Sequence, residues 1–154
     1  MTIQLTTLAN GFRVLTDHLP HLGTITSGVW VGVGARNERP EVNGISHFLE
    51  HMIFKGTKSR DALAIALEIE NRGGEFNAYT DYDVTAYYTQ MAAKHVDTSC
   101  EIIGDIVLNS VFPQEEVEKE RGVVIQEIGR YADEPEDVVY EALRRTAFEG
   151  QALG

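Results

Sequence analysis

The feature that most constrains this chain is the run His47-Phe48-Leu49-Glu50-His51. On an α-helix, positions i, i+3 and i+4 lie within about 100° of one another, so His47, Glu50 and His51 share one face. Two neutral imidazoles one turn apart are a natural chelate for zinc, and a nearby carboxylate that is not a ligand can handle the proton of a bound water. The order H-x-x-E-H is the inverse of the commoner H-E-x-x-H. The sequence therefore predicts a metal-binding helix here.

The composition restricts the partners. The 154 residues include 13 Lys and Arg against 24 Asp and Glu, a formal net charge of −11, and 43% are hydrophobic. These proportions are typical of one globular domain. An acidic chain is repelled by nucleic acid and by anionic membranes, so we expect neither as a partner, whereas a basic peptide would be attracted. The simpler alternative is acidity that only maintains solubility.

Cysteine usage and the N-terminal segment indicate a compartment. The single cysteine, Cys100, excludes an internal disulfide and favours a reducing environment. We expect it to be a small buried hydrophobic residue. The sequence begins without a basic leader, an apolar signal segment or an Arg- and Ser-rich amphipathic stretch, and no run approaches 18 apolar residues. These features predict a cytoplasmic location.

The first strands follow from alternation. Polar and apolar residues alternate around Asn10-Gly11, which predicts a β-hairpin over residues 3–18 with a type I′ turn. Residues 24–35 alternate apolar positions with a face rich in glycine, which predicts a strand on which a helix can pack closely.

The remaining elements follow from caps, breakers and periodicity. Strands and helices mix without strict β-α-β alternation, which predicts an α+β fold with a mixed, largely antiparallel sheet packed with helices. In chain order we expect a loop over 37–43, the metal-motif helix ending near 55–56, a helix capped by Ser59 and stopped at 72–74, strands over 75–78 and 84–91, and helices over 94–109, 114–131 and 136–148.

A catalytic zinc site needs three protein donors and an open position, so the two histidines require a third donor. Glu120 and Glu127 lie seven residues apart on one predicted helix, about 20° apart around its axis. Val117, Val124 and Ile128 lie near the same face, which favours inward carboxylates in need of a cation. Solvated glutamates paired with neighbouring basic residues are the alternative. The other candidate donors are Cys100, His18, His21 and His95.

Five stretches of the sequence together form a family signature. They are LANGFRV at 8–14, GVGARNE at 32–38, GISHFLEHMIFKGT at 44–57, NAYT at 77–80 and ERGVVIQEI at 120–128. With these stretches, and with Glu127 placed 76 residues after His51, the chain resembles the M16 or pitrilysin-type metallopeptidases, especially the catalytic beta subunit of mitochondrial processing peptidase and its bacterial relatives.

The resemblance implies roles for five residues. His47, His51 and Glu127 would bind one zinc ion per chain, Glu50 would be the general base that activates the bound water, and Glu120 would be an acidic residue that supports the site. The chemistry of these residue types agrees with the resemblance, because three ligands leave an open position and zinc lowers the pKa of bound water toward about 7.

The resemblance also implies how a substrate binds. Family members bind an extended peptide as an added strand on a sheet edge, and the matching residues here are Asn77, Ala78, Tyr79 and Thr80.

In the processing peptidases, two acidic residues ten and fourteen positions beyond the third ligand recognise a substrate arginine. Asp137 and Glu141 occupy those positions, one helical turn apart, and a carboxylate pair can bind a guanidinium. An incidental pair of acids in an acidic stretch is the alternative.

Family members are longer than this chain and have a second, similarly folded half that closes over the site. The resemblance therefore implies that residues 1–154 are the N-terminal part of an M16 catalytic domain with a truncated LuxS/MPP-like metallohydrolase fold, the C-terminal remainder and second domain being absent. Such a chain needs the second domain or a partner subunit. An exposed sheet edge would also favour a homo-oligomer.

The function implied is that of a zinc-dependent endopeptidase acting on extended peptide or unfolded-protein substrates, with a preference for a nearby arginine. A non-catalytic scaffold or partner subunit is the main alternative, because some family members lose the motif. A lyase of the autoinducer-synthesis type, which uses a cysteine as third ligand, ranks lower because Cys100 lies on a different predicted helix from Glu127.

Overall fold

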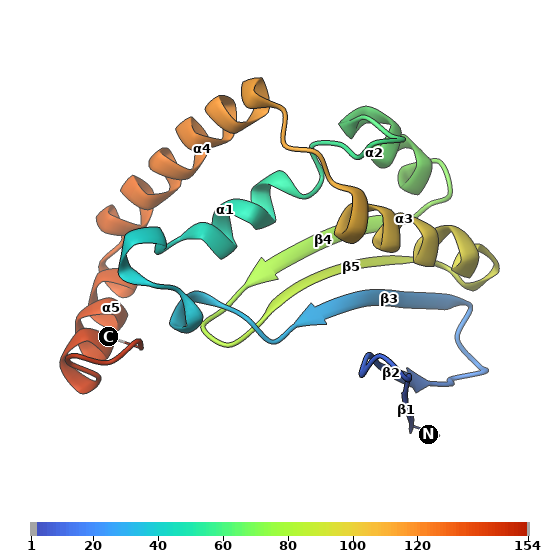
Figure 1. The fold of residues 1–154 in the computed structure, drawn as a ribbon, viewed down its shortest axis with the longest axis horizontal. Helices are drawn as coiled ribbons and strands as arrows, with labels where there is room; N and C mark the ends of the chain where they lie inside the picture. Colours follow the sequence, from blue (N-terminus) through green and yellow to red (C-terminus); the bar gives the residue numbers. More distant parts are fainter. Residues whose placement is uncertain (1–2, 154) are drawn as a thin grey trace.

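A computed structural model describes residues 3–153, in which helices cover one face of a three-stranded sheet (Figure 1). The sheet has the order β3-β5-β4, formed by Thr24–Val31, Thr85–Ala92 and Glu75–Thr80, and both outer strands pair antiparallel with β5. The predicted α+β class with a largely antiparallel sheet is confirmed. The helices are α1 (Ile45–Met52), α2 (Ala62–Glu70), α3 (Val96–Asn109), α4 (Gln114–Asp133) and α5 (Pro135–Ala147), and 3-10 turns occupy Ala35–Asn37, Pro40–Val42 and Ala93–His95.

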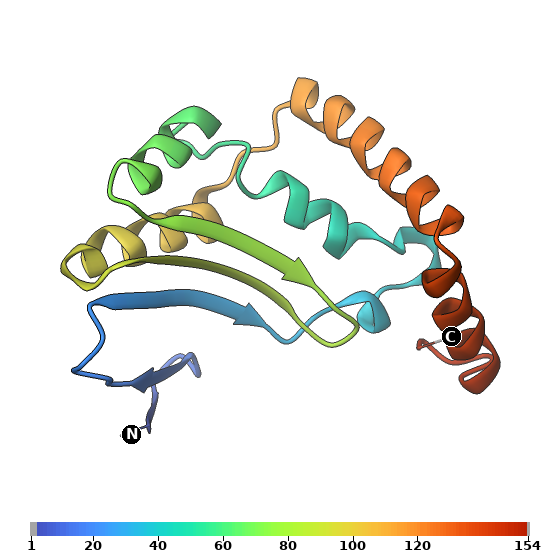
Figure 2. The ribbon, with the colours of Figure 1, turned by 180° about the vertical axis from the view of Figure 1, so that it is seen from behind.

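The helices form two layers over the sheet. Helices α1, α2 and α3 contact the strands, whereas α4 packs on α1 and continues into α5. Seen from behind, α4 and α5 run along one side of the molecule, and the hairpin of β1 (Ile3–Thr7) and β2 (Arg13–Asp17) lies beyond β3, away from the helices (Figure 2). No helix within residues 3–153 combines the length and apolar character needed to cross a membrane.

The core lies between the sheet and the helices. Alternation along β5 turns Tyr87, Thr89 and Met91 inward, and all three are buried. Complete burial of an Ile or Met side chain stabilises a fold by roughly 1.5–3 kcal/mol, so a core of this kind is sufficient to hold α2 and α3 on the sheet. The buried core consists of Ile53, Ile65, Ile69, Tyr87, Met91, Ile102, Ile103 and Ile106.

The predicted hairpin is confirmed, but its turn type is wrong. A type I′ turn needs a positive φ at both central residues, and Gly11 has φ 86° whereas Asn10 does not share that conformation. The Asn10 side chain accepts a hydrogen bond from the backbone N–H of Phe12 at 3.0 Å, and the Gly11 N–H donates to the carbonyl of Leu8 at 2.9 Å. Local side-chain bonding of Asn10 therefore favours a wider turn with only glycine in the left-handed region.

The glycine face of β3 does not receive a helix, contrary to the prediction. Ser27 faces α3 and hydrogen bonds to Ser99, so the neighbouring Gly28 points to the opposite side of the sheet. There, a Cβ on Gly28 would lie 2.7 Å from the Cβ of Tyr88 on β5. The small residue makes room for an aromatic side chain in the adjacent strand.

Two further expectations were wrong. Helix α2 is capped by Asp61, whose Oδ1 accepts from the Ala64 N–H at 2.7 Å. Ser59 lies two residues before this cap, and its hydroxyl donates to Asp105 at 2.9 Å. Cys100 is exposed on α3, since the buried face of that helix is occupied by isoleucines. The other predicted elements are confirmed with ends that move by a few residues.

Arg60, in the loop between α1 and α2, links this loop to helices α2 and α3. Its guanidinium donates to Glu68 at 2.9 Å, to Glu101 at 2.6 Å and to Asp105 at 2.8 Å. Burial disfavours the charged form of Asp105, but hydrogen bonds led by those from Thr57 and Arg60 outweigh it and lower the pKa of Asp105 to about 2. The charged carboxylate therefore stabilises the folded chain.

The free energy of unfolding should depend on pH through Asp105. Because the folded-state pKa is depressed from 3.8 to about 2, this stabilisation is present above pH 4 and is lost as the pH falls through 2. We expect Asp105→Asn to cost about 1–2 kcal/mol at pH 6, allowing for solvent screening, and almost nothing near pH 2. Urea unfolding at several pH values measures this difference.

The matched control is Glu70→Gln, which removes the same charge from an exposed position on α2. It should leave the unfolding free energy almost unchanged at either pH. An Asp105→Asn cost that is equal at pH 6 and pH 2 would contradict an electrostatic role.

Candidate metal centre

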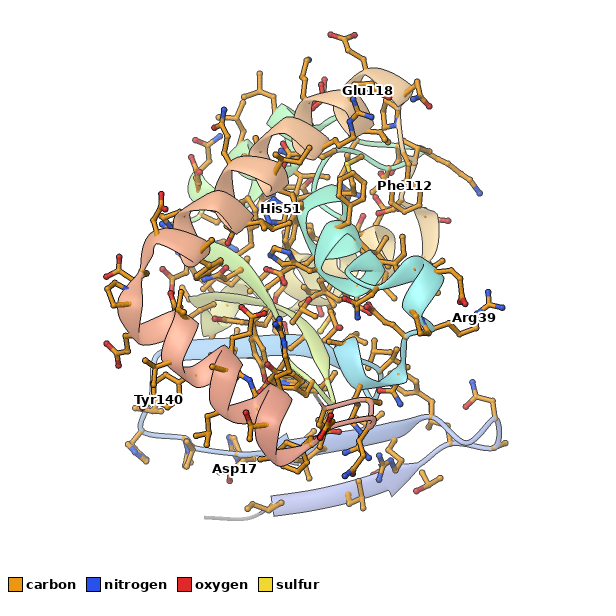
Figure 3. All side chains as sticks on the ribbon, turned by 90° about the vertical axis from the view of Figure 1, so that its left-hand side faces the viewer. Asp17, Arg39, His51, Phe112, Glu118 and Tyr140 are labelled. Carbon is orange, nitrogen blue, oxygen red and sulfur yellow. The ribbon has the colours of Figure 1, made fainter. Side chains whose placement is uncertain are left out.

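Helix α1 presents both histidines toward α4. The rings of His47 and His51 lie edge to face with centroids 4.8 Å apart, and their Nε2 atoms are 3.3 Å apart. Figure 3 shows His51 between α1 and α4, whereas Glu118 lies on the outer side of α4. Met52 is 2% exposed, so an apolar position anchors the helix while the histidine face stays half-buried.

Helix α4 brings a carboxylate to these histidines. Glu127 Oε2 lies 3.3 Å from His51 Nε2 and 3.7 Å from His47 Nε2. Val124, on the same side of α4, is half-buried against the neighbouring structure. The expected inward face is therefore present, although Ile128 is 60% exposed and lies outside it.

The donor geometry fits zinc. Zinc binds imidazole nitrogen and carboxylate oxygen at roughly 2.0–2.2 Å, so a tetrahedral site holds its donor atoms about 3.3–3.5 Å apart. The three separations here are 3.3, 3.3 and 3.7 Å. A cluster of His47, His51 and Glu127 could hold one ion and leave the fourth position open. No other group of three such donors occurs within residues 3–153, so the alternative donors Cys100, His18, His21 and His95 lie elsewhere.

Glu120 contacts His51 at Nδ1, the ring nitrogen that faces away from Glu127. It is 8% exposed, its Oε2 lies 3.1 Å from His51 Nδ1, and its Oε1 lies 2.5 Å from Lys55 Nζ. Burial disfavours the charged form, but the hydrogen bonds from Lys55 and His51 outweigh it and lower the pKa of Glu120. The carboxylate can then accept a hydrogen bond from the Nδ1–H of His51, which leaves the Nε2 lone pair free for a metal.

Glu50 and His51 both line a cavity of about 390 Å³. Glu50 also acts on Tyr87 in β5: the pKa of Tyr87 is raised mainly by burial and additionally by the nearby Glu50 carboxylate. Phe54 and Phe76 pack together there with ring centroids 4.7 Å apart. The cavity is lined by Glu50, His51, Phe54, Lys55, Ala62, Phe76, Asn77, Ala78 and Glu120.

Strand β4 forms the edge of the sheet nearest this cavity. Of the four predicted peptide-binding residues, Asn77 and Ala78 line the cavity. Thr80 hydrogen bonds to the carbonyl of Ser46 at 3.4 Å. Tyr79 lies on the opposite face, where its hydroxyl accepts from the Trp30 Nε1–H at 3.2 Å. The structure thus brings half of this set to the cavity wall.

The predicted arginine-binding pair lies on α5, beyond the C-terminal end of α4 (Figure 1). Asp137 is half-buried, and Glu141 pairs with Arg145 at 2.6 Å on the same helix. Neither side chain lines the cavity. The structure does not bring them to the donor cluster.

Sequence reasoning missed Lys55 and Glu38. Lys55 follows the end of α1, and its position four residues after His51 beside an inward glutamate was the available signal. Glu38 hydrogen bonds to the first backbone amides of α1. No periodic signal marks Glu38, because it lies in an irregular segment between two 3-10 turns.

Comparison with known proteins identifies the family of this chain. The sequence profile described as insulinase, peptidase family M16, matches residues 13–154. The chain belongs to the M16 peptidase family. The family resemblance predicted from the five sequence stretches is therefore confirmed.

Individual M16 relatives support the same assignment. The chain is 39% identical to the uncharacterized zinc protease YmxG of Bacillus subtilis over 96% of this chain and 36% of that protein. It is 42% identical to the mitochondrial-processing peptidase subunit beta of Rattus norvegicus over 98% of this chain and 31% of that protein. The chain spans about a third of the length of these relatives.

A solved protease structure shows the same fold. The crystal structure of a protease from Helicobacter pylori superposes with a TM-score of 0.91 at 31% identity, covering 99% of this chain and 37% of that one. The predicted fold is confirmed over the part of the chain that the structure describes.

Zinc affinity should separate the roles of the two α4 glutamates. Glu127→Gln removes an anionic donor and should weaken zinc binding by more than about 100-fold, whereas Glu120→Gln removes the support of His51 and should weaken it by about 10–100-fold. Competition with a chromophoric chelator measures both constants. Glu118→Gln, on the outer side of α4, is the control and should bind as the unsubstituted protein does. Unchanged affinity in Glu127→Gln would show that the third donor lies elsewhere.

Proposed function

We propose that this chain carries the zinc centre of a metalloendopeptidase that hydrolyses peptide bonds in extended peptides. The observation that carries the proposal is the cluster of two imidazole nitrogens and one carboxylate oxygen, 3.3 to 3.7 Å apart, next to the cavity that holds Glu50. Membership of the M16 family and the names of its zinc protease relatives support it.

Each residue of the centre has a distinct part. A zinc ion supplies Lewis-acid chemistry when bound. His47, His51 and Glu127 hold the ion, and Glu120 keeps the His51 ring in the required orientation and tautomer. Glu50 takes a proton from the attacking water and passes it to the leaving amine. This division leaves Glu50 outside the ligand set, so it stays available as a base.

The substrate adds a strand to β4. This strand pairs with β5 on one side, and its other edge adjoins the cavity through Asn77 and Ala78. Backbone pairing along an edge strand provides affinity with little dependence on side chains. An extended segment of a peptide or an unfolded protein is therefore the expected substrate.

Selectivity for arginine would come from α5. The Arg145 guanidinium already lies 2.6 Å from the Glu141 carboxylate, which supports an acidic surface able to pair with a guanidinium. A substrate arginine would replace this internal partner and use Asp137 as a second acceptor.

Activity is proposed for the protein that includes the rest of the M16 architecture. The relatives are about three times as long as the matched segment. We propose that residues 1–154 form the N-terminal part of a catalytic domain that works with a second M16 domain or a partner subunit. We also propose that copies associate through the other outer strand, β3, which leaves the β4 edge to the substrate.

The decisive variant is Glu50→Gln in the full-length protein. It should keep one zinc ion per chain and lose about 10²- to 10⁴-fold in kcat, because the base is removed while the ligands remain. Metal analysis and cleavage of a fluorogenic peptide provide the measurements, with Glu118→Gln as the matched surface control. An active Glu50→Gln protein would contradict the role of Glu50 as the base. An unsubstituted protein that contains no zinc would favour a non-catalytic scaffold.

The arginine preference has its own test. Asp137→Asn combined with Glu141→Gln should lower kcat/KM on the order of tenfold for a peptide with arginine near the cut, because charge-assisted hydrogen bonds are lost. Cleavage of a matched peptide lacking arginine should change little. Glu136→Gln, an exposed acid on the same helix, serves as control. Equal losses on both peptides would rule out selective recognition.

A further inference from the structure

Helix α1 begins without a side-chain cap of its own. Its N-cap residue is Gly44, with φ 94°, which offers no side-chain acceptor. The first amides of a helix have no partner within the helix, and a helix as short as Ile45–Met52 is marginal on its own. The start of the metal helix therefore depends on an acceptor from outside.

Glu38 supplies that acceptor. Its Oε2 accepts from the Gly44 N–H at 2.5 Å, and its Oε1 accepts from the Ser46 N–H at 2.7 Å. Although burial acts in the other direction, the hydrogen bonds from Ser46 and Gly44 lower the pKa of Glu38. An anionic carboxylate at this end of a helix is also favoured by the helix dipole.

The segment that carries Glu38 is fixed to the turn between β4 and β5. Ala35 N–H donates to the carbonyl of Asp81 and Arg36 N–H to that of Tyr82, both at 3.1 Å. A Cβ on Gly34 would lie 2.1 Å from the Asp81 carbonyl oxygen, so only glycine fits this approach. The Glu38 carboxylate thus connects the sheet to α1.

Ser46, the residue before His47, is held from both sides. Glu38 accepts from its N–H, and the hydroxyl of Thr80 at the end of β4 donates to its carbonyl at 3.4 Å. Ser46 is 9% exposed, so this contact lies inside the structure. The same residue is therefore tied to the sheet edge and to the acidic cap.

From this geometry we propose that Glu38 is a positioning residue for the metal centre, which fixes the first turn of α1 and so sets His47 relative to His51, Glu127 and the edge strand β4. The inference rests on the zinc site proposed above. Glu38 does not touch the donors, and it acts through the backbone of Gly44 and Ser46.

The test uses Glu38→Gln in the full-length protein. An amide can accept through one oxygen only, and its NH₂ group opposes the second backbone N–H, so the helix start should shift. We expect zinc affinity to fall about tenfold, within the range of residues that orient ligands. The visible absorption spectrum of the Co²⁺-substituted protein should change, and kcat should fall with little change in KM. Circular dichroism at the assay temperature establishes that both proteins are folded.

Glu41→Gln is the matched control, because Glu41 is an exposed acid in the same segment. It should leave the zinc affinity and the Co²⁺ spectrum unchanged. If Glu38→Gln does not fold, Glu38→Asp decides, since it keeps the charge and shortens the reach by one methylene, and it should give an intermediate affinity. A folded Glu38 variant with the zinc affinity and spectrum of the unsubstituted protein would overturn the inference and leave the zinc site intact. Absence of zinc binding by the unsubstituted protein would overturn both.

Discussion

The buried carboxylate of Glu120 is the constraint on which the site depends. A carboxylate that is 8% exposed needs strong donors, and it has two, the Lys55 ammonium and the His51 ring. Both come from one short segment around the end of α1, so α4 packs against α1 in one register. That register places Glu127, two turns further along α4, on the other side of the histidine pair. The same packing of α4 on α1 therefore places Glu120 beside His51 Nδ1 and Glu127 beside the Nε2 atoms of both histidines.

The residues that could be predicted from the sequence are those whose positions follow from a helical repeat. His47, Glu50 and His51 share a face by spacing alone, and the seven-residue spacing of Glu120 and Glu127 places both carboxylates toward the histidines. The α+β class and most elements also followed from alternation and breakers. In each case the information lies within one element, where neighbouring positions determine direction.

What could not be predicted depends on contacts between distant parts of the chain. Alternation in β3 distinguishes the two faces of the strand, but it does not show which face the helices cover. In the structure Gly28 pairs with Tyr88 of β5 and lies on the same face as that side chain. The sequence made Ser59 a plausible cap, but in the structure its hydroxyl donates to Asp105 on α3. Glu38 lies in irregular backbone whose course is determined by the turn after β4. The arginine-binding role of Asp137 and Glu141 was inferred from family positions alone; both residues lie on α5 and do not line the cavity, and the role stays a prediction.

The contact between α1 and α4 has an electrostatic consequence. It places Glu120 2.5 Å from the Lys55 ammonium group and Glu127 3.3 Å from His51, with Glu50 on the wall of the neighbouring cavity. Three carboxyl groups and one amine therefore lie in this region of the molecule, a composition that suits a divalent cation. If His47, His51 and Glu127 hold an ion, its binding and the docking of α4 on α1 would be linked equilibria, and each would stabilise the other by the same free energy. The metal concentration would then set how stably α4 packs against the rest of the fold.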